Sequence, residues 1–185
     1  RKGVKWNNGD DFTAADVARN IEGWCDKSVE GNSMAARMAS LVDDATGKAA
    51  DGAIVVKDDH TVVLTAKQPD ITLIPGMADY PAAIVHASFK ADERLSNPVG
   101  TGYMLPDGLE VGVKGAIVRN EGHDWWGYAA GKGGYLDRIE FIDYGTDPAA
   151  FVAAFMRLTI PATSFLNTDS HTAPFLNESY IPYIL

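Results

Sequence analysis

The stretch that decides the fold is the opening of the chain, RKGVKWNNGDDFTAADV over residues 1–17. Val4 and Trp6 alternate with polar residues, as in a short strand with one buried face. The four residues Asn7-Asn8-Gly9-Asp10 that follow are typical of a tight turn, because Asn and Gly tolerate unusual backbone angles. The beginning of this stretch therefore predicts a strand that ends in a turn.

The second half of the same stretch predicts the start of a helix. Thr13 is a favourable N-cap, and Asp16 stands three residues later, where a carboxylate can accept from free backbone N–H groups. Phe12 before the cap and Val17 four residues after it can form a hydrophobic staple. Apolar residues continue at helical spacing, so we expect a helix over residues 13–25.

Further along, the pattern alternates between helical and extended segments. Residues 33–42 predict a second helix with Met34, Met38 and Leu41 on one face, and we interpret these methionines mainly as core residues. Residues 53–66 predict a β-hairpin whose turn is Asp58-Asp59-His60, with His60 exposed to solvent.

The remaining segments complete an alternation typical of an α/β protein. Residues 70–89 predict a short helix and then an extended apolar segment at 82–85, and residues 90–97 a charged loop. Strands are expected within 111–119 and 134–142, and a helix from residue 147. Gly100 and Gly102 flank Thr101, and we expect positive φ angles there and a close approach to another segment.

Composition restricts the partners of this chain. Its formal net charge is −9, and its pI is about 4.8. Nucleic acids and anionic membranes bind basic surfaces, so neither is expected as a partner. The one cysteine, Cys25, excludes an intrachain disulfide and is interpreted as a buried thiol.

Several blocks of this sequence resemble the extracellular solute-binding proteins of peptide ABC transporters, which include dipeptide-, oligopeptide- and nickel-binding members. The opening segment resembles the family pattern R-x-G-V-K-F-x-D-G-x-P-x-T-A-x-D-V. Residues 97–103, NPVGTGY, resemble P-V-G-T-G-P-Y but lack the proline before Tyr103. Residues 57–69, 120–127 and 134–141 resemble three further blocks in the family's order.

The resemblance implies part of a bilobed periplasmic-binding-protein-like α/β fold with mixed sheets, truncated at both ends. It assigns 1–95 to a variable extra domain, 96–175 to part of the main ligand-binding lobe, and leaves 176–185 unassigned. The pattern breaks near residue 155, where some tens of residues of the family pattern are missing.

The implied function is binding of short peptides in a cleft between lobes, for import through a membrane permease. Thr163 and Ser164 would then donate or accept hydrogen bonds, and Phe165 would form an apolar wall. Tyr80 and Met34 are weaker candidates at the rim. The resemblance implies a monomer in the periplasm or outside the cell, lipid-anchored in some members, with no cofactor, no metal and no catalytic residue.

Other interpretations stay open at this stage. The same scaffold could bind a nickel chelate, an oligosaccharide or an opine. An α/β hydrolase is a third hypothesis, and it would require His123 and Asp124 to meet another histidine. Trp125 and Trp126 could stack on a ligand or pack inward. Residues 127–133 resemble a P-loop only superficially, because the spacing is wrong and no Ser or Thr follows Lys132.

Overall fold

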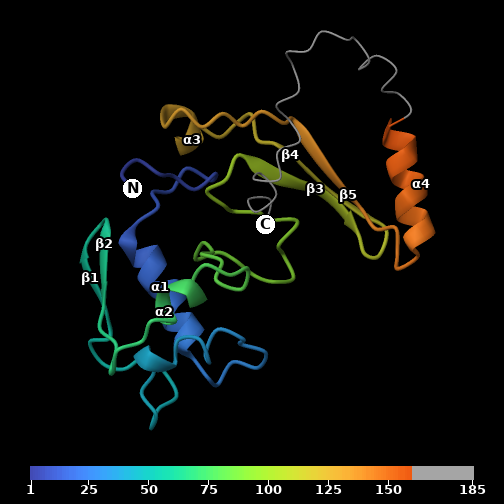
Figure 1. Ribbon diagram of the computed structural model, residues 1–185. Helices are drawn as coiled ribbons and strands as arrows, with labels where there is room; N and C mark the ends of the chain where they lie inside the picture. Colours follow the sequence, from blue (N-terminus) through green and yellow to red (C-terminus); the bar gives the residue numbers. More distant parts are fainter. Residues whose placement is uncertain (160–185) are drawn as a thin grey trace, which may run out of the picture. The chain divides into compact units, whose positions relative to one another are not determined.

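The computed structural model of this protein describes residues 1–159. These residues belong to two compact units (Figure 1). The first contains Arg1–Gly108 and Ala116–Ile139, and the second contains Leu109–Gly115 and the chain from Glu140 onward. The assignment of 1–95 and 96–175 to particular lobes stays a prediction.

The chain opens with the predicted turn. The N–H of Trp6 donates to the carbonyl of Asp10 (2.9 Å), and the N–H of Phe12 donates to the carbonyl of Val4 (3.0 Å). Gly9 has a φ of 96°, which a residue with a side chain rarely adopts. The turn is therefore confirmed, whereas the expected strand shortens to one antiparallel bridge between Lys5 and Asp11.

Helix α1 runs over Ala14–Cys25 with Thr13 as its N-cap, as predicted. The carboxylate of Asp16 accepts a hydrogen bond from the N–H of Thr13 at 3.0 Å. The N–H of Ala14 donates to the carbonyl of Asp59 at 2.8 Å, so the hairpin satisfies one of the free donors at the helix start.

The predicted hairpin is confirmed and packs against α1 (Figure 1). Strands β1 (Ile54–Asp58) and β2 (Thr61–Leu64) pair antiparallel, with Val55 opposite Val63. The N–H of His60 donates to the carboxylate of Asp58 at 2.9 Å, which closes the turn. His60 itself is exposed, as expected.

The helix predicted over 33–42 is wrong in type but right in its buried face. Only a 3₁₀ helix, η1 (Ala39–Leu41), forms there, after a series of turns. Most backbone bonds of the segment span three residues, for example Leu41 N–H to Met38 C=O at 2.8 Å. Because a short isolated helix is marginal on its own, tight turns that bury the same side chains are an adequate alternative.

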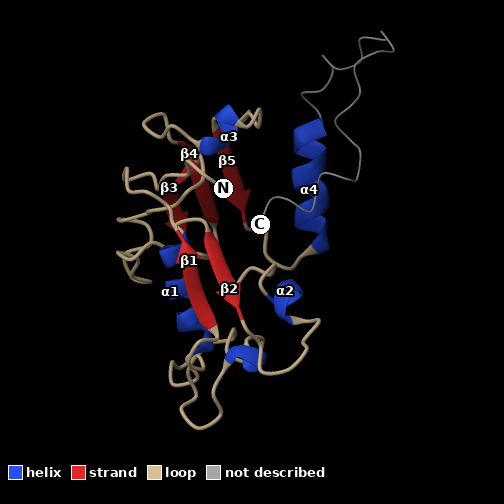
Figure 2. Ribbon diagram, turned by 90° about the vertical axis from the view of Figure 1, so that its left-hand side faces the viewer, coloured by secondary structure: helices blue, strands red, loops and turns tan. Residues whose placement is uncertain are grey.

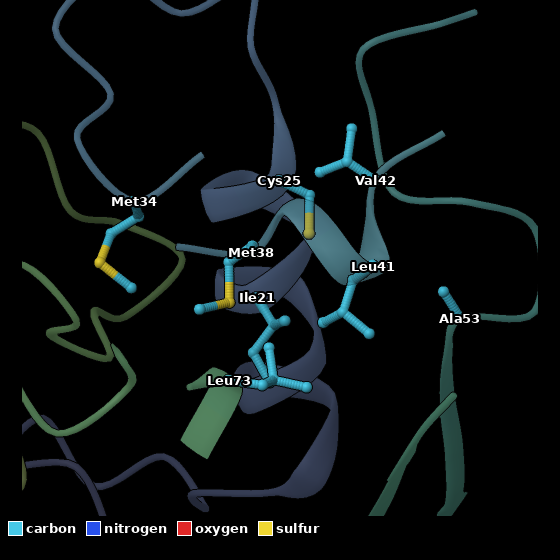
Figure 3. Packing of buried hydrophobic residues seen from close by; sticks show 8 residues of the cluster. All are labelled: Ile21, Cys25, Met34, Met38, Leu41, Val42, Ala53 and Leu73. Atoms are coloured by element: carbon cyan, nitrogen blue, oxygen red, sulfur yellow. The ribbon is translucent and has the colours of Figure 1, made fainter. Parts of the chain in front are cut away.

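The core of the first unit forms where α1, the 34–42 segment, the hairpin and α2 converge. Met38, Leu41 and Val42 are completely buried (Figure 3). Ile21 and Cys25 point into the same cluster from α1, and Ala53 and Leu73 complete it (Figure 3). Burial of this kind supplies most of the favourable free energy of folding.

The segment after the short helix α2 (Leu73–Gly76) runs along α1 without joining a sheet. Asn20, which is buried on α1, substitutes for a neighbouring strand. Its Nδ2 donates to the carbonyl of Val85 at 2.9 Å, and its Oδ1 accepts from the N–H of Val85 at 3.1 Å. The extended segment predicted at 82–85 is thus held by a side chain rather than by strand pairing.

Replacing Asn20 with alanine should therefore lower the free energy of unfolding by about 1–3 kcal/mol, because the N–H of Val85 loses the Asn20 acceptor, while the Val85 carbonyl keeps the bond from Arg19 Nη2 at 2.5 Å. Urea unfolding followed by circular dichroism measures this change. The exposed Glu22 of the same helix is the matched control. Equal stability of the Asn20→Ala and Glu22→Ala variants would contradict the role given to Asn20.

A second sheet has the strand order β3-β4-β5 (Figure 2). Strands β4 (Lys114–Arg119) and β5 (Arg138–Ile142) confirm the strands expected there, whereas β3 (Met104–Glu110) was not predicted. Helix α3 (Trp126–Ala129) lies between β4 and β5 in the sequence. Gly100 and Gly102, just before β3, do not have positive φ, contrary to our expectation.

In the second unit, the tip of the β3–β4 hairpin meets the end of β5, where the N–H of Asp143 donates to the carbonyl of Val113 at 2.9 Å. Helix α4 (Pro148–Thr159) confirms the helix expected from residue 147. Tyr144 and Phe151 contact edge to face, with ring centroids 6.0 Å apart. Within residues 1–159, no helix has the length and apolar character needed to cross a membrane.

Candidate functional site

The five predicted ligand contacts have different fates. Thr163, Ser164 and Phe165 lie outside the described residues. Tyr80 is 83% exposed, so its ring is available to a partner. Met34 is only 2% exposed and belongs to the core cluster, which is the packing role we favoured for the methionines.

The fold brings the segments that carry Tyr80 and Met34 together. Arg37, one turn after Met34, forms an ion pair with Asp79 (Nη1–Oδ2 2.6 Å). The other carboxylate oxygen of Asp79 accepts from the N–H of Tyr80 at 2.8 Å. Asp79 therefore links the backbone of Tyr80, whose ring is exposed, to the segment that carries Met34 and Arg37.

The hydrogen bond from Arg37, and after it that from Tyr80 N–H, holds the pKa of Asp79 below its usual range. Because its pKa is lower in the folded state than in the unfolded state, the ionised carboxylate of Asp79 stabilises the fold at pH values above the ordinary carboxyl pKa. This stabilisation is lost as the pH falls through the folded-state pKa. We expect stability to decline as the pH falls below the ordinary carboxyl pKa of about 4, and the Asp79→Asn variant to decline less. Thermal unfolding over this pH range measures the difference, and identical pH profiles would contradict it.

Polar contacts join three segments of the first unit, residues 6–12, 85–88 and 97–100, in a junction. Asn7 is linked to Pro98 and Gly100 by hydrogen bonds, and His86 is linked to Asp10 (Nε2–Oδ2 3.1 Å). Trp6 is buried beneath them and contacts the rings of Phe12 and His86 edge to face, at 5.3 and 5.1 Å. We call this set the 6–12/86/98–100 junction.

An aromatic cluster formed by Tyr103, Trp125, Trp126 and Tyr128 is the second feature. The ring of Trp125 lies within 5.4 Å of each of the other three, measured between centroids. A Cβ added at Gly127 would lie 2.2 Å from the Trp125 ring, so only glycine allows this packing. Both tryptophans are partly buried, which fits scaffold packing better than an open stacking surface.

Arg119 fixes the loop that follows this cluster. Its guanidinium donates to the carboxylate of Asp137 (Nη2–Oδ1 2.8 Å) and to the carbonyl of Gly134 (2.6 Å). It also reaches the hydroxyl of Tyr128 at 3.4 Å. The glycine-rich segment between α3 and β5 is therefore tied down by these contacts.

The described residues give little support to a catalytic or metal site. No three His, Cys, Asp or Glu side chains within residues 1–159 gather closely enough to hold a metal ion. His60 lies at the hairpin tip, and His86 contacts Ser88 and Asp10. His171 lies outside the described residues. Burial, and to a lesser degree Glu22, raises the pKa of the Cys25 thiol to about 11, which makes it a poor nucleophile.

The family profile described as bacterial extracellular solute-binding proteins, family 5 Middle, matches residues 1–178. The chain belongs to this family. The resemblance proposed from the sequence motifs is thereby confirmed. No curated protein matches the chain.

Several solved structures share the fold of this chain. The murein tripeptide binding protein MppA of Escherichia coli is 19% identical to this chain, with a TM-score of 0.66. The aligned region covers 84% of this chain and 32% of the MppA chain. OppA of Haemophilus influenzae, in complex with RPPGFSPFR, is 20% identical, with a TM-score of 0.62. The aligned region covers 90% of this chain and 36% of the OppA chain. AgaA of A. tumefaciens, in complex with agropinic acid, is 23% identical, with a TM-score of 0.61. The aligned region covers 83% of this chain and 28% of the AgaA chain.

These matches confirm an α/β architecture that is part of the periplasmic binding protein fold. The chain spans about a third of the length of these solved structures. Sequence reasoning missed Asn7 and His86 of the junction, because their partners lie far away along the chain. The only local signal was the pair of glycines at 100 and 102, from which a close approach to another segment was expected, and Gly100 does make it.

Proposed function

We propose that this family 5 chain is part of the substrate-binding component of an ABC transporter and that it binds short peptides in a cleft between lobes for import. The match of the family profile to residues 1–178 carries this proposal. Binding of this kind makes and breaks no covalent bond. Hydrogen bonds to the peptide backbone, with water-filled side-chain pockets, would allow many peptide sequences to bind.

The names of the structural relatives support a peptide as the solute. One is a murein tripeptide binding protein, and another holds RPPGFSPFR. In this chain we assign Thr163, Ser164 and Phe165 to the cleft and Tyr80 to its rim. Met34 would act indirectly, since its segment carries Arg37, which holds the backbone beside Tyr80.

The remaining assignments follow from the same family. The partner would be an ABC transporter permease, and the protein would act as a monomer in the periplasm or outside the cell. It would have no enzymatic activity of its own and would not bind nucleic acid. A net charge of −9 is in keeping with the last point.

Titration calorimetry of the full-length protein that carries this chain, with a library of dipeptides to nonapeptides, tests the proposal. We expect saturable binding, and the Thr163→Ala and Ser164→Ala variants should each bind roughly fivefold more weakly, as for loss of one hydrogen bond. Phe89→Ala, at an exposed aromatic residue that is not assigned to the cleft, is the control. Absence of binding to every peptide would overturn the proposal.

A second candidate is binding of a small opine-type solute on the same scaffold. It is favoured by the relative AgaA, whose structure holds agropinic acid. Native mass spectrometry of the protein as purified separates the two candidates. A co-purified peptide mass supports the first, and a smaller non-peptide mass supports the second.

A further inference from the structure

Asn7 makes an unusual set of contacts for a residue in a surface turn. Its Nδ2 donates to the carbonyl of Pro98 at 2.8 Å, and its Oδ1 accepts from the N–H of Gly100 at 3.3 Å. Its own N–H donates to the carbonyl of Gly100 at 2.9 Å. One residue thus grips a backbone segment more than 90 positions away with both its side chain and its main chain.

The turn that presents Asn7 is itself held rigidly. Gly9 N–H donates to the carbonyl of Trp6 at 2.9 Å, and Asn8 Nδ2 donates to the carboxylate of Asp10 at 2.8 Å. The same carboxylate contacts His86 Nε2 at 3.1 Å. Trp6, 1% exposed, anchors the turn from below. The backbone that carries Asn7 is therefore held in place by these contacts.

The third segment of the junction is tied to the other two. The amide of Asn97 donates to the hydroxyl of Ser88 at 3.4 Å, and Ser88 Oγ lies 2.9 Å from His86 Nδ1. The segment held in this way, 97–103, has no regular secondary structure and leads directly into β3. Its position consequently depends on contacts with other segments, which include two side-chain hydrogen bonds and one main-chain hydrogen bond of Asn7 and the bond from Asn120 N–H to the Tyr103 carbonyl at 2.8 Å.

We propose that Asn7 is a positioning residue for solute binding, because it holds the 97–103 segment, and with it the start of β3, against the turn that precedes α1. This inference rests on the proposed function, in which residues 96–175 form part of the main ligand-binding lobe. A solute that binds between preformed walls loses affinity when a wall must first be ordered, since binding then includes the free-energy cost of ordering. Loosening this segment should therefore weaken binding without unfolding the core.

The test compares Asn7→Ala with Asn7→Asp and with Glu22→Ala in the full-length protein. Alanine removes both side-chain hydrogen bonds, whereas aspartate keeps an acceptor for Gly100 N–H and loses the donor to Pro98. Glu22 is the control, because it is exposed on α1 and takes no part in the junction. Hydrogen exchange of residues 97–103 and peptide affinity by calorimetry are the two measurements.

For Asn7→Ala we expect roughly tenfold faster exchange at Val99 and Gly100 and roughly three- to tenfold weaker peptide binding, with Glu22→Ala unchanged in both. Unchanged exchange in Asn7→Ala would overturn the claim that Asn7 holds the segment. Faster exchange with unchanged affinity would overturn the claim that this holding serves binding. If the unaltered protein binds no peptide, the proposed function fails, and exchange alone still decides whether Asn7 holds the segment.

Discussion

Replacing Trp6 with alanine is expected to lower the free energy of unfolding by about 3–5 kcal/mol, as is typical for truncation of a buried aromatic residue. The side chain is 1% exposed and contacts Phe12 and His86 through their ring edges. Its loss would leave a cavity beneath the 6–12/86/98–100 junction, where the hydrogen bonds of Asn7 and His86 depend on the position of the turn. Urea unfolding followed by far-ultraviolet circular dichroism measures the change.

Two further variants isolate the cause. Trp6→Phe keeps an aromatic ring and removes an indole N–H that has no hydrogen-bond partner in the described structure, so it should cost less than half as much as alanine. Lys5→Ala alters the adjacent residue, whose ion pair with Asp11 is exposed, and should change stability by less than about 1 kcal/mol. A Trp6→Ala variant no less stable than Lys5→Ala would refute the buried role of Trp6.

Replacing Leu41 with alanine is expected to cost about 2–5 kcal/mol. Leu41 is completely buried and points into the cluster formed with Ile21, Met38 and Leu73 (Figure 3). The cost combines the transfer free energy of the removed atoms with that of the cavity they leave, since a well-packed core relaxes only in part. Chemical unfolding gives the value directly.

The volume-conserving change Leu41→Met should cost less than about 1.5 kcal/mol, because methionine fills nearly the same space. Val29 is 55% exposed, so Val29→Ala serves as the control for removal of apolar atoms at the surface. If Leu41→Ala and Val29→Ala were equally mild, the core described around η1 would be wrong.

The aromatic cluster and the junction give the chain two different kinds of scaffold. Around Trp125, glycines at 127 and 134 allow rings to lie against the backbone, with a Cβ at Gly134 only 2.6 Å from the Tyr103 ring. At the junction, polar side chains join backbone segments that form no sheet with one another. At the aromatic cluster, a side chain added at either glycine would clash with a ring. At the junction, each substitution of a polar side chain removes only the hydrogen bonds of that residue.

Much of the local structure was predictable because its causes are local. Thr13 and Asp16 define the start of α1 within three residues, and the Asp58 carboxylate closes the β1–β2 turn through its own neighbour His60. The segment 33–42 shows the limit of such reasoning. Its apolar spacing predicted which side chains are buried, but the same spacing can be met by turns and a 3₁₀ helix when packing supplies the free energy.

By itself, the sequence determined α1 and its cap, the β1–β2 hairpin and its turn, the approximate positions of β4, β5 and α4, and the family through motifs that recur in a fixed order. The tertiary structure alone decided that Asn7 meets Gly100, that Asn20 takes the place of a strand beside Val85, and that Met34 packs inside while Tyr80 is exposed. The physical reason is range. Caps, turns and periodicity act over a few residues, whereas these contacts join positions up to 93 apart, whose meeting depends on the packing of the whole unit.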